Sequence, residues 1–383
     1  TTDRARLAAW TKRVEAKGGT VASVQQLGST SLTDAAQALA VQTPGAAADL
    51  SLATRFRPVL LFDRREKLNS PLDVAAFFAS GRVRLCHDDK IRPGDDPCPV
   101  ISSAASLVSG PTHLKIDPPR HGAAAAPTAI YVHPTRPRSG GGKWLYLDYW
   151  WYLDGNPADI ASGATCGIGL AMPGKTCFNH PSDWEGMTVI VDTSDEEARP
   201  VAVQYAQHKE TVRYDWADER RRWADLLARP SGRLSTKVQQ NLRAIQDLAD
   251  RPVAFIGQGT HATYARPCTG NCHQTLASDL TENHYGGEVS WIGNDTAKCV
   301  SFTCVQLLPT RLNGKVPALW NAYTGVWGDR RCILRGSYCT SELSPGAPST
   351  QPRYRDPARI TGVVDGVQKP RRCGGKAEAC PPL

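Results

Sequence analysis

The sequence predicts an all-β protein, an antiparallel β-sandwich with helical additions. Short segments rich in β-branched and aromatic residues recur along the chain, and polar loops separate them. These segments do not alternate with helical patterns, as the strands of a parallel α/β sheet do. The expected strands are residues 128–133, 144–153, 184–192, 201–207, 252–258, 287–292 and 301–308.

Three parts of the chain differ in composition. Residues 1–54 are alanine-rich with helical spacing, and the proline and glycine at 44 and 45 are expected to end this helical segment. Residues 55–360 carry the strands and form the expected sandwich domain. Within it, residues 86–128 are rich in proline, glycine and alanine and predict a long loop. Residues 361–383 are expected to form a C-terminal tail closed by a disulfide.

A helical insertion at about 215–250 interrupts the β pattern. Residues 215–227 and 234–248 have helical spacing, and the first of these segments places three arginines at 220–222 beside Trp216 and Trp223. Such a pair of helices packs against a sheet in most proteins. A lid or a surface-docking element is the alternative interpretation.

The twelve cysteines predict a disulfide-rich protein of an oxidising compartment. They fall into close neighbours at 86/98, 166/177, 268/272, 299/304, 332/339 and 373/380, with no histidines at zinc-finger spacing. The chain begins without a signal peptide, so we expect the mature form of a secreted protein.

Composition excludes several other classes. The chain of 383 residues is 41% hydrophobic, long enough to bury a large core, and lacks a run of about 18 apolar residues that would span a membrane. No nucleic-acid-binding module is recognisable. The net charge of +8 suits a partner such as an anionic membrane or a cell-wall polymer.

Residues 178–192 (FNHPSDWEGMTVIVD) hold the strongest signal of a site. In an extended strand, Asp183 and Glu185 share one face, and Trp184 points to the other. Two carboxylates on an apolar face are costly to bury without a counter-charge. A divalent cation would supply that charge: calcium or magnesium first, with manganese or zinc as alternatives because His180 is near. The plainer interpretation is an exposed turn with solvated acids.

The segment WLYLDYWWYLD at 144–154 has two unlike faces. One face is apolar core, and the other mixes aromatic rings with acids, a composition typical of a binding surface. On this second face, Trp150, Tyr152 and Asp148 are candidate ligand-binding residues. Asp154, at the end of the strand, is a further candidate metal ligand.

Two histidines stand at the ends of other expected strands. His208 follows QYAQ, and His261 follows the glycines of VAFIGQGT, where a bulge can aim the next side chain. A single histidine in such a place is more often structural. Several of them beside acids favour one shared site, in which His208 and His261 would be the acid–base residues of an enzyme.

Several segments resemble a known family in the same order: FRPVLLFDRREKLNSPLDVAAFF, HPSDWEGMTV, AVQYAQHKE, PVAFIGQGTHATY, NAYTGVWGD and SPGAPSTQPRYRDPA. Over roughly residues 55–360 the chain resembles the vacuolar protein sorting-associated protein 62 family. More distantly, HPSDWEG is similar to the signature of the necrosis- and ethylene-inducing cytolysins.

The second resemblance implies a β-sandwich that holds a divalent cation and targets sphingolipid head groups. By it, His180, Asp183 and Glu185 are metal-site residues, and Asp154 matches an upstream acid. The chain departs from that pattern at Ser182, where the cytolysins have a second histidine.

Two functions follow as expectations. The first is a secreted, cation-dependent protein that binds glycan or lipid head groups. The second is a metal-dependent hydrolase of phosphoester or glycosidic bonds, although no GxSxG, P-loop or HExxH motif is present. A metal-free structural protein is the remaining alternative. The sequence predicts no oligomeric state.

Overall fold

The computed structural model describes most of the region between Pro44 and Pro357. The described residues are 44–63, 71–87, 98–108, 112–117, 127–136, 142–156, 180–207, 210–228, 239–240, 243, 251–257, 261–265, 268–269, 284–285, 289–292, 305–308, 320–328, 331–333, 338–340 and 344–357. Residues 1–43 of the expected helical segment and the tail at 361–383 lie outside them.

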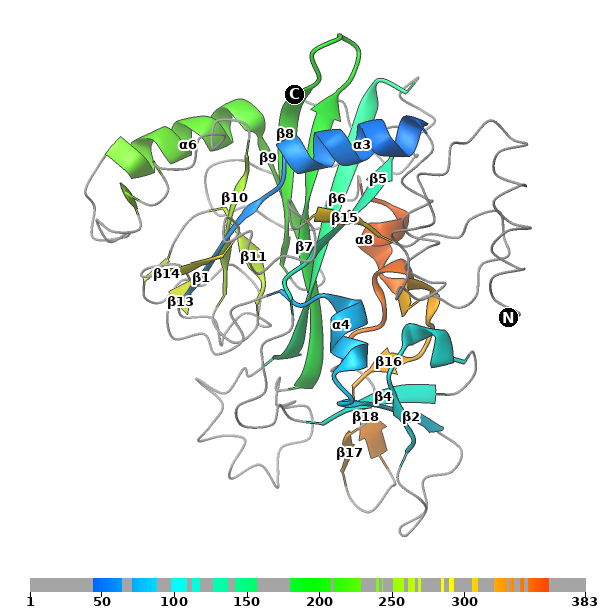
Figure 1. The fold of residues 1–383 in the computed structure, drawn as a ribbon. Coiled ribbons are helices and arrows are strands. Elements are labelled where there is room, and N and C mark those ends of the chain that lie inside the picture. The colour runs from blue at the N-terminus through cyan, green and yellow to red at the C-terminus, as the bar shows by residue number, and fades with distance from the viewer. Residues whose placement is uncertain are drawn as a thin grey trace.

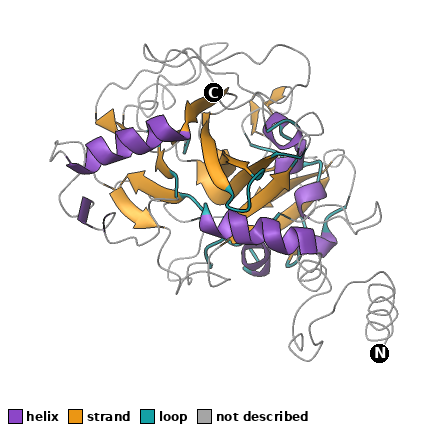
Figure 2. Cartoon of the chain, turned by 90° about the horizontal axis from the view of Figure 1, so that it is seen from above, coloured by secondary structure: helices purple, strands orange, loops and turns teal. Residues whose placement is uncertain are grey.

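The described part is mostly β-sheet with few helices (Figures 1 and 2). The α-helices are α3 (Pro44–Arg55), α4 (Val74–Ala79), α6 (Trp216–Ala228) and α8 (Pro352–Arg355), and the 3₁₀ turns are η3 (Ala104–Ser106), η7 (Trp320–Ala322) and η8 (Pro348–Thr350). The strands are β1 (Val59–Asp63), β2 (Val83–His87), β3 (Val100–Ile101), β4 (Thr112–Ile116), β5 (Ile130–Thr135), β6 (Trp144–Asn156), β7 (His180–Asp192), β8 (Arg199–Gln207), β9 (Glu210–Asp215), β10 (Val253–Ile256), β11 (Thr263–Tyr264), β12 (Cys268–Thr269), β13 (His284–Tyr285), β14 (Val289–Ile292), β15 (Val305–Leu307), β16 (Val326–Trp327), β17 (Arg331–Ile333) and β18 (Tyr338–Thr340).

Three larger sheets organise these strands. The central sheet has the order β15-β5-β6-β7-β8-β9, and two four-stranded sheets have the orders β11-β10-β1-β14 and β16-β4-β2-β3. Each of these sheets contains one parallel pair. It is β15 with β5 in the central sheet, β1 with β10 in the second sheet and β16 with β4 in the third. The expectation of purely antiparallel sheets is therefore wrong, because strands distant in sequence complete each sheet.

Both faces of the central sheet are buried. On one face, a first core joins β5–β9 to β1, β10 and α3. On the other, a second core joins β5–β7 to α4, β2, β4 and the aromatic residues near β16. Figure 1 shows the sheet of β1, β10 and β14 on one side of the long strands β6 and β7, and α4, β2, β4 and β16 on the other.

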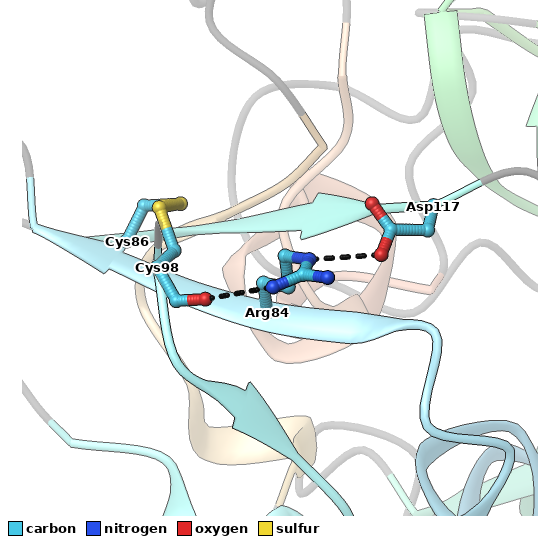
Figure 3. Close-up of a disulfide and its surroundings, with 4 residues drawn as sticks. All are labelled: Arg84, Cys86, Cys98 and Asp117. Carbon is cyan, nitrogen blue, oxygen red and sulfur yellow. Dashed lines mark hydrogen bonds and ion pairs between the residues drawn. A yellow bond between two sulfur atoms is a disulfide. The ribbon is translucent and has the colours of Figure 1, made fainter. Parts of the chain in front are cut away.

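One disulfide is present in the described part of the chain. It joins Cys86 on β2 to Cys98, as expected from their spacing. Figure 3 shows Arg84 beside it, bonded through Nε to Asp117 at 2.8 Å and through Nη1 to the Cys98 carbonyl at 3.3 Å.

We expected a disulfide-rich fold, but the described part of the chain shows one bridge. Cys332 and Cys339 lie opposite each other on β17 and β18, as their predicted pairing requires. The pairs 166/177, 299/304 and 373/380, together with Cys272, lie outside the described ranges.

Three local expectations need correction. Pro44 and Gly45 begin helix α3, where we expected a break in the helical segment, and this position suits proline because the first helical turn needs no N–H donor. The expected loop at 86–128 contains β4, a strand between β2 and β16. Strand β9 precedes helix α6 where we expected no strand.

No helix in the described ranges is long and apolar enough to span a membrane.

Candidate functional site

Strands β6 and β7 form the ladder on which the predicted site lies. Glu185 pairs with Trp151 and Asp183 with Leu153, and both partners belong to the first core. Asp183 and Glu185 therefore share the face expected from the alternation, while Trp184 faces the second core. Both carboxylates are buried, with relative exposures of 6% and 7%, so the expectation of a solvated turn is wrong.

His261 is brought to this face from another sheet. Its Nδ1 lies 3.1 Å from Asp183 Oδ2, although 78 residues separate the two in sequence, and its side chain is fully buried. An imidazole protonated at Nδ1 donates a charge-assisted hydrogen bond to this carboxylate. The expected proximity of His261 to the acids is thus confirmed.

Backbone conformation marks the same place. Among the described residues, those other than glycine with positive φ are Ser182, at 65°, and His261, at 61°. Ser182 directly precedes Asp183, and its Oγ lies 2.7 Å from Tyr152 Oη. Left-handed conformations cost energy in residues with a Cβ and concentrate at functional sites.

Asp154 does not join the acids. Because Leu153 faces the first core, Asp154 points to the opposite face of β6. There its Oδ2 forms an ion pair with Arg82 Nη1 at a distance of 2.7 Å. Its prediction as a metal ligand beside Asp183 is therefore corrected: the strand alternation separates the two carboxylates.

The predicted ligand-binding residues are core residues. Trp150, Tyr152 and Asp148 each have a relative exposure of 0%. Trp150 Nε1 donates to Asp148 Oδ2 at 2.6 Å, and the ring of Tyr152 packs 5.1 Å from that of Trp184. A sugar cannot stack on these rings, because the second core covers this face of β6. Sequence alternation identified the face correctly but did not show what covers it.

Asp148 is instead the centre of a buried ionic cluster. Thr188 Oγ1 donates to Oδ1 at 2.9 Å, and Arg353 Nη1 lies 3.1 Å from the same oxygen. Burial raises the pKa of Asp148 to about 6, against the lowering effect of Arg353 and the hydrogen bonds. The carboxylate is thus ionised at neutral pH and paired with Arg353. The alternation of β6 gave no signal for this distant partner.

Two predicted residues cannot be placed fully. The side chain of His180 and the whole of His208 lie outside what the structure describes, although His180 begins β7. Within the described ranges, no three His, Cys, Asp or Glu side chains gather closely enough to hold a metal ion. Of the predicted donors, Asp183 and His261 are in contact, and Glu185 shares the Asp183 face of β7 without completing a cluster of three among the described residues.

Thr263 is a candidate that sequence reasoning missed. It pairs with Ile256, whose side chain is in the first core, so Thr263 faces the central sheet, and β11 lies against β7 and β8. Its hydroxyl is fully buried and has no hydrogen-bond partner within the described part of the chain. The sequence signal that could have identified Thr263 is its position two residues after His261, which places both side chains on one face of an extended segment.

This donor set fits a divalent cation in its chemistry. Two buried carboxylates, an imidazole and a buried hydroxyl are oxygen and nitrogen donors of the kind that calcium, magnesium, manganese and zinc accept. The buried hydroxyl of Thr263 also fits, because a buried polar group ordinarily has a partner.

Comparisons with known proteins give little support for a family. No protein-family model matches the sequence, and no curated protein matches it. The resemblance to the vacuolar protein sorting-associated protein 62 family is not supported.

Among solved structures, the chain is similar to Necrosis and Ethylene inducing Protein 2 from the causal agent of cocoa's witches' broom disease. The identity is 13% and the TM-score 0.23, over 53% of this chain and 60% of that chain. The neighbour agrees in name with the cytolysin resemblance, but a likeness of this strength carries no argument about fold or function.

Proposed function

We propose that the protein binds a divalent cation at Asp183, Glu185 and His261, and through it the head groups of anionic lipids. The observation that carries the proposal is the buried contact of 3.1 Å between Asp183 and His261. The contact joins Asp183 on β7 of the central sheet to His261, which lies two residues before β11 of the neighbouring sheet. The second buried carboxylate, Glu185, is on the same face of β7 as Asp183. His180 is the expected additional donor.

Three further observations support this proposal. The left-handed backbone at Ser182 and His261 concentrates strain at the same place. The two acids share one buried face and offer carboxylate oxygens, which are ligands that divalent cations accept. The net charge of +8 favours an anionic partner. A lipid head group is preferred over a glycan because Trp150 and Tyr152 are buried and offer no stacking surface.

A metal-dependent hydrolase is the second candidate, favoured by the same dyad. A carboxylate that accepts from Nδ1 fixes the imidazole tautomer in which Nε2 carries the basic lone pair. His261 held in this way would serve as a general base, and a bound cation would polarise a phosphoester oxygen. The expected role of His208 as acid or base belongs to this candidate.

Secretion is proposed from the cysteine pattern and the oxidised Cys86–Cys98 pair. We also propose that the central sheet and the sheet of β1, β10, β11 and β14 form the expected sandwich around the first core.

Co-sedimentation with phosphatidylserine vesicles tests the proposed function. Wild-type protein should pellet with vesicles in calcium or magnesium and remain in solution in EDTA. Asp183→Asn should remain in solution in both, and Glu196→Gln, at an exposed acid, should behave as wild type. Equal pelleting with and without cation would contradict the proposal. Release of phosphate or a free head group during incubation would favour the hydrolase.

A further inference from the structure

A row of polar side chains crosses the face of the central sheet that carries the second core. Each member lies directly opposite the next on the strands β5 to β9, and the five are His133, Asp148, Thr188, Gln204 and Arg213. Residues paired directly across strands project from the same face of a sheet, so the row is continuous. Buried polar groups need hydrogen-bond partners, and the row therefore depends on what covers it.

Residues 351–357 cover this row. Each of three contacts joins the segment to one strand: Tyr354 stacks on His133 of β5 with 3.9 Å between the ring centres, Arg353 Nη1 lies 3.1 Å from Asp148 Oδ1 of β6, and Gln204 Nε2 of β8 donates to the Pro357 carbonyl at 2.6 Å. In Figure 1, α8 lies on the side of β6 and β7 opposite to β1 and β10. The segment is thus attached across the sheet by polar and stacking contacts.

Arg353 enters a site with one partner for each part of its guanidinium group. Nη1 lies 3.1 Å from Asp148 Oδ1, both terminal nitrogens lie 3.4 Å from the Tyr149 carbonyl oxygen, and Cζ lies 3.7 Å from the centre of the Trp150 ring. A carboxylate and a carbonyl accept hydrogen bonds at the edge of such a planar cation, and an aromatic ring attracts its face. We call the Asp148 carboxylate, the Tyr149 carbonyl and the Trp150 ring the guanidinium site.

The guanidinium site takes its shape from β6 and β7. Trp150 Nε1 donates to Asp148 Oδ2 at 2.6 Å, and Thr188 Oγ1 donates to Oδ1 at 2.9 Å, so two donors other than Arg353 orient the carboxylate. A Cβ at Gly186 would collide with the guanidinium and with the Tyr149 carbonyl oxygen. Glycine at this position therefore leaves the space that the flat group occupies.

The segment that delivers Arg353 contributes little to the apolar core. No residue of α8 is buried, whereas the Arg353 side chain itself is only 10% exposed. Segments with few buried apolar contacts open locally at a lower free energy than the core strands of the same protein. The attachment of residues 351–357 therefore depends mainly on the arginine.

We propose that residues 351–357 are a latch over the polar row, and that the guanidinium site is a binding site that Arg353 fills when the latch is closed. The ligand class is a guanidinium group, because a lysine ammonium lacks the flat fork and the stacking face. This inference goes beyond the proposed function and does not depend on it, since the guanidinium site lies on the face of β6 and β7 opposite to Asp183.

Hydrogen exchange of the full chain, with chemical rescue by methylguanidinium, tests the inference. Arg353→Ala should exchange the amides of residues 351–357 at least about 10-fold faster than wild type, because removing one partner of a buried ion pair is strongly destabilising. The amides of β1 and β10, behind the opposite face of the sheet, should keep their wild-type rates. Millimolar methylguanidinium should slow the exchange of the latch in Arg353→Ala and leave wild type, whose site is filled, unchanged.

Methylammonium at the same ionic strength is the matched ligand control and should not slow exchange in Arg353→Ala. Arg355→Ala, at an exposed arginine of the same helix, is the matched variant and should exchange as wild type. Wild-type exchange in a folded Arg353→Ala, or the same response of this variant to methylguanidinium and methylammonium, would overturn the inference. If Arg353→Ala does not fold, Asp148→Asn removes the charge of the site instead and should also speed exchange of the latch. Unchanged exchange in that variant would overturn the inference.

Discussion

His261 places its Nδ1 3.1 Å from the Asp183 carboxylate, with both side chains buried between two sheets. Asp183 belongs to β7 of the central sheet, and His261 lies two residues before β11 of the neighbouring sheet. The contact therefore depends on the packing of the two sheets and connects the candidate site to the stability of the first core.

A double-mutant cycle measures this contact. Asp183→Asn and His261→Gln should each lower the free energy of unfolding at pH 7, by about 1.5–3 kcal/mol for a buried hydrogen bond to a charged group. The double variant should lose less than the sum of the two, since they remove one shared interaction. Urea unfolding of the four proteins without added cation checks this. Strict additivity would show that the two side chains do not interact.

Thr263→Val distinguishes a site residue from a packing residue. Valine has nearly the same shape and removes a buried hydroxyl that costs roughly 1–3 kcal/mol when it is unsatisfied. In EDTA, the variant should therefore be as stable as wild type or more stable. With saturating cation, wild type should gain more stability than the variant if the hydroxyl serves the site. Thermal melts of both proteins in the two buffers give the comparison, and an identical gain would remove Thr263 from the site.

Alternation along β6 and β7 was the part of the site that the sequence predicted well. A strand period of two assigned Asp183 and Glu185 to one face and Trp184 to the other, as found. The same period could not show that Trp150 and Tyr152 are covered, because the covering residues, including Trp327, come from distant segments. It also could not show that Arg353 reaches Asp148, since that pairing depends on the path of residues 344–357.

The missed fold features have similar causes. Strand β9 carries three charged residues in six, and Arg213 bonds to Gln204 of the neighbouring strand β8, which the local pattern does not reveal. The parallel pairs arise from strands far apart in sequence, which local patterns do not relate. In contrast, helix α4 has a local start signal. Asp73 caps α4 by accepting from the Ala76 N–H at 2.7 Å.

Glu219 predicts a pH dependence of stability. It is fully buried on α6 and accepts a 2.6 Å hydrogen bond from Tyr205 Oη. Burial raises the pKa of Glu219 from 4.5 to about 7. The folded state therefore binds this proton more tightly than the unfolded state. The resulting stability is fully present below pH 4.5 and is lost as the pH rises through 7.

Comparison with Glu219→Gln isolates this contribution. Relative to the variant, wild type should lose roughly 3 kcal/mol of unfolding free energy between pH 4.5 and pH 8. Burial lowers the pKa of His133 to about 4, so its contribution has the opposite sign, but it is common to both proteins and cancels. Asp225→Asn, an exposed acid on the same helix, is the control. A pH-independent difference between wild type and Glu219→Gln would contradict the assignment.

The Cys86–Cys98 disulfide should stabilise the second core. It closes a loop with a sequence separation of 12, for which restriction of the unfolded chain contributes about 2–3 kcal/mol. Replacing both cysteines with serine should lower the free energy of unfolding by about that amount, and reduction of wild type should have a similar effect. Urea titrations with and without dithiothreitol check this. Unchanged midpoints in both cases would show that the bridge is not formed in solution.

The central claim is that Asp183 and its neighbours bind a divalent cation, and melting curves test it most directly. Wild-type protein is melted in EDTA and then with calcium, magnesium, manganese or zinc. A cation at 100 times its dissociation constant stabilises the folded state by about 2.7 kcal/mol, so at least one cation should raise the wild-type melting temperature by a few degrees. Asp183→Asn should lose this rise and Glu196→Gln should keep it. A wild-type melting temperature that no cation changes would contradict the claim.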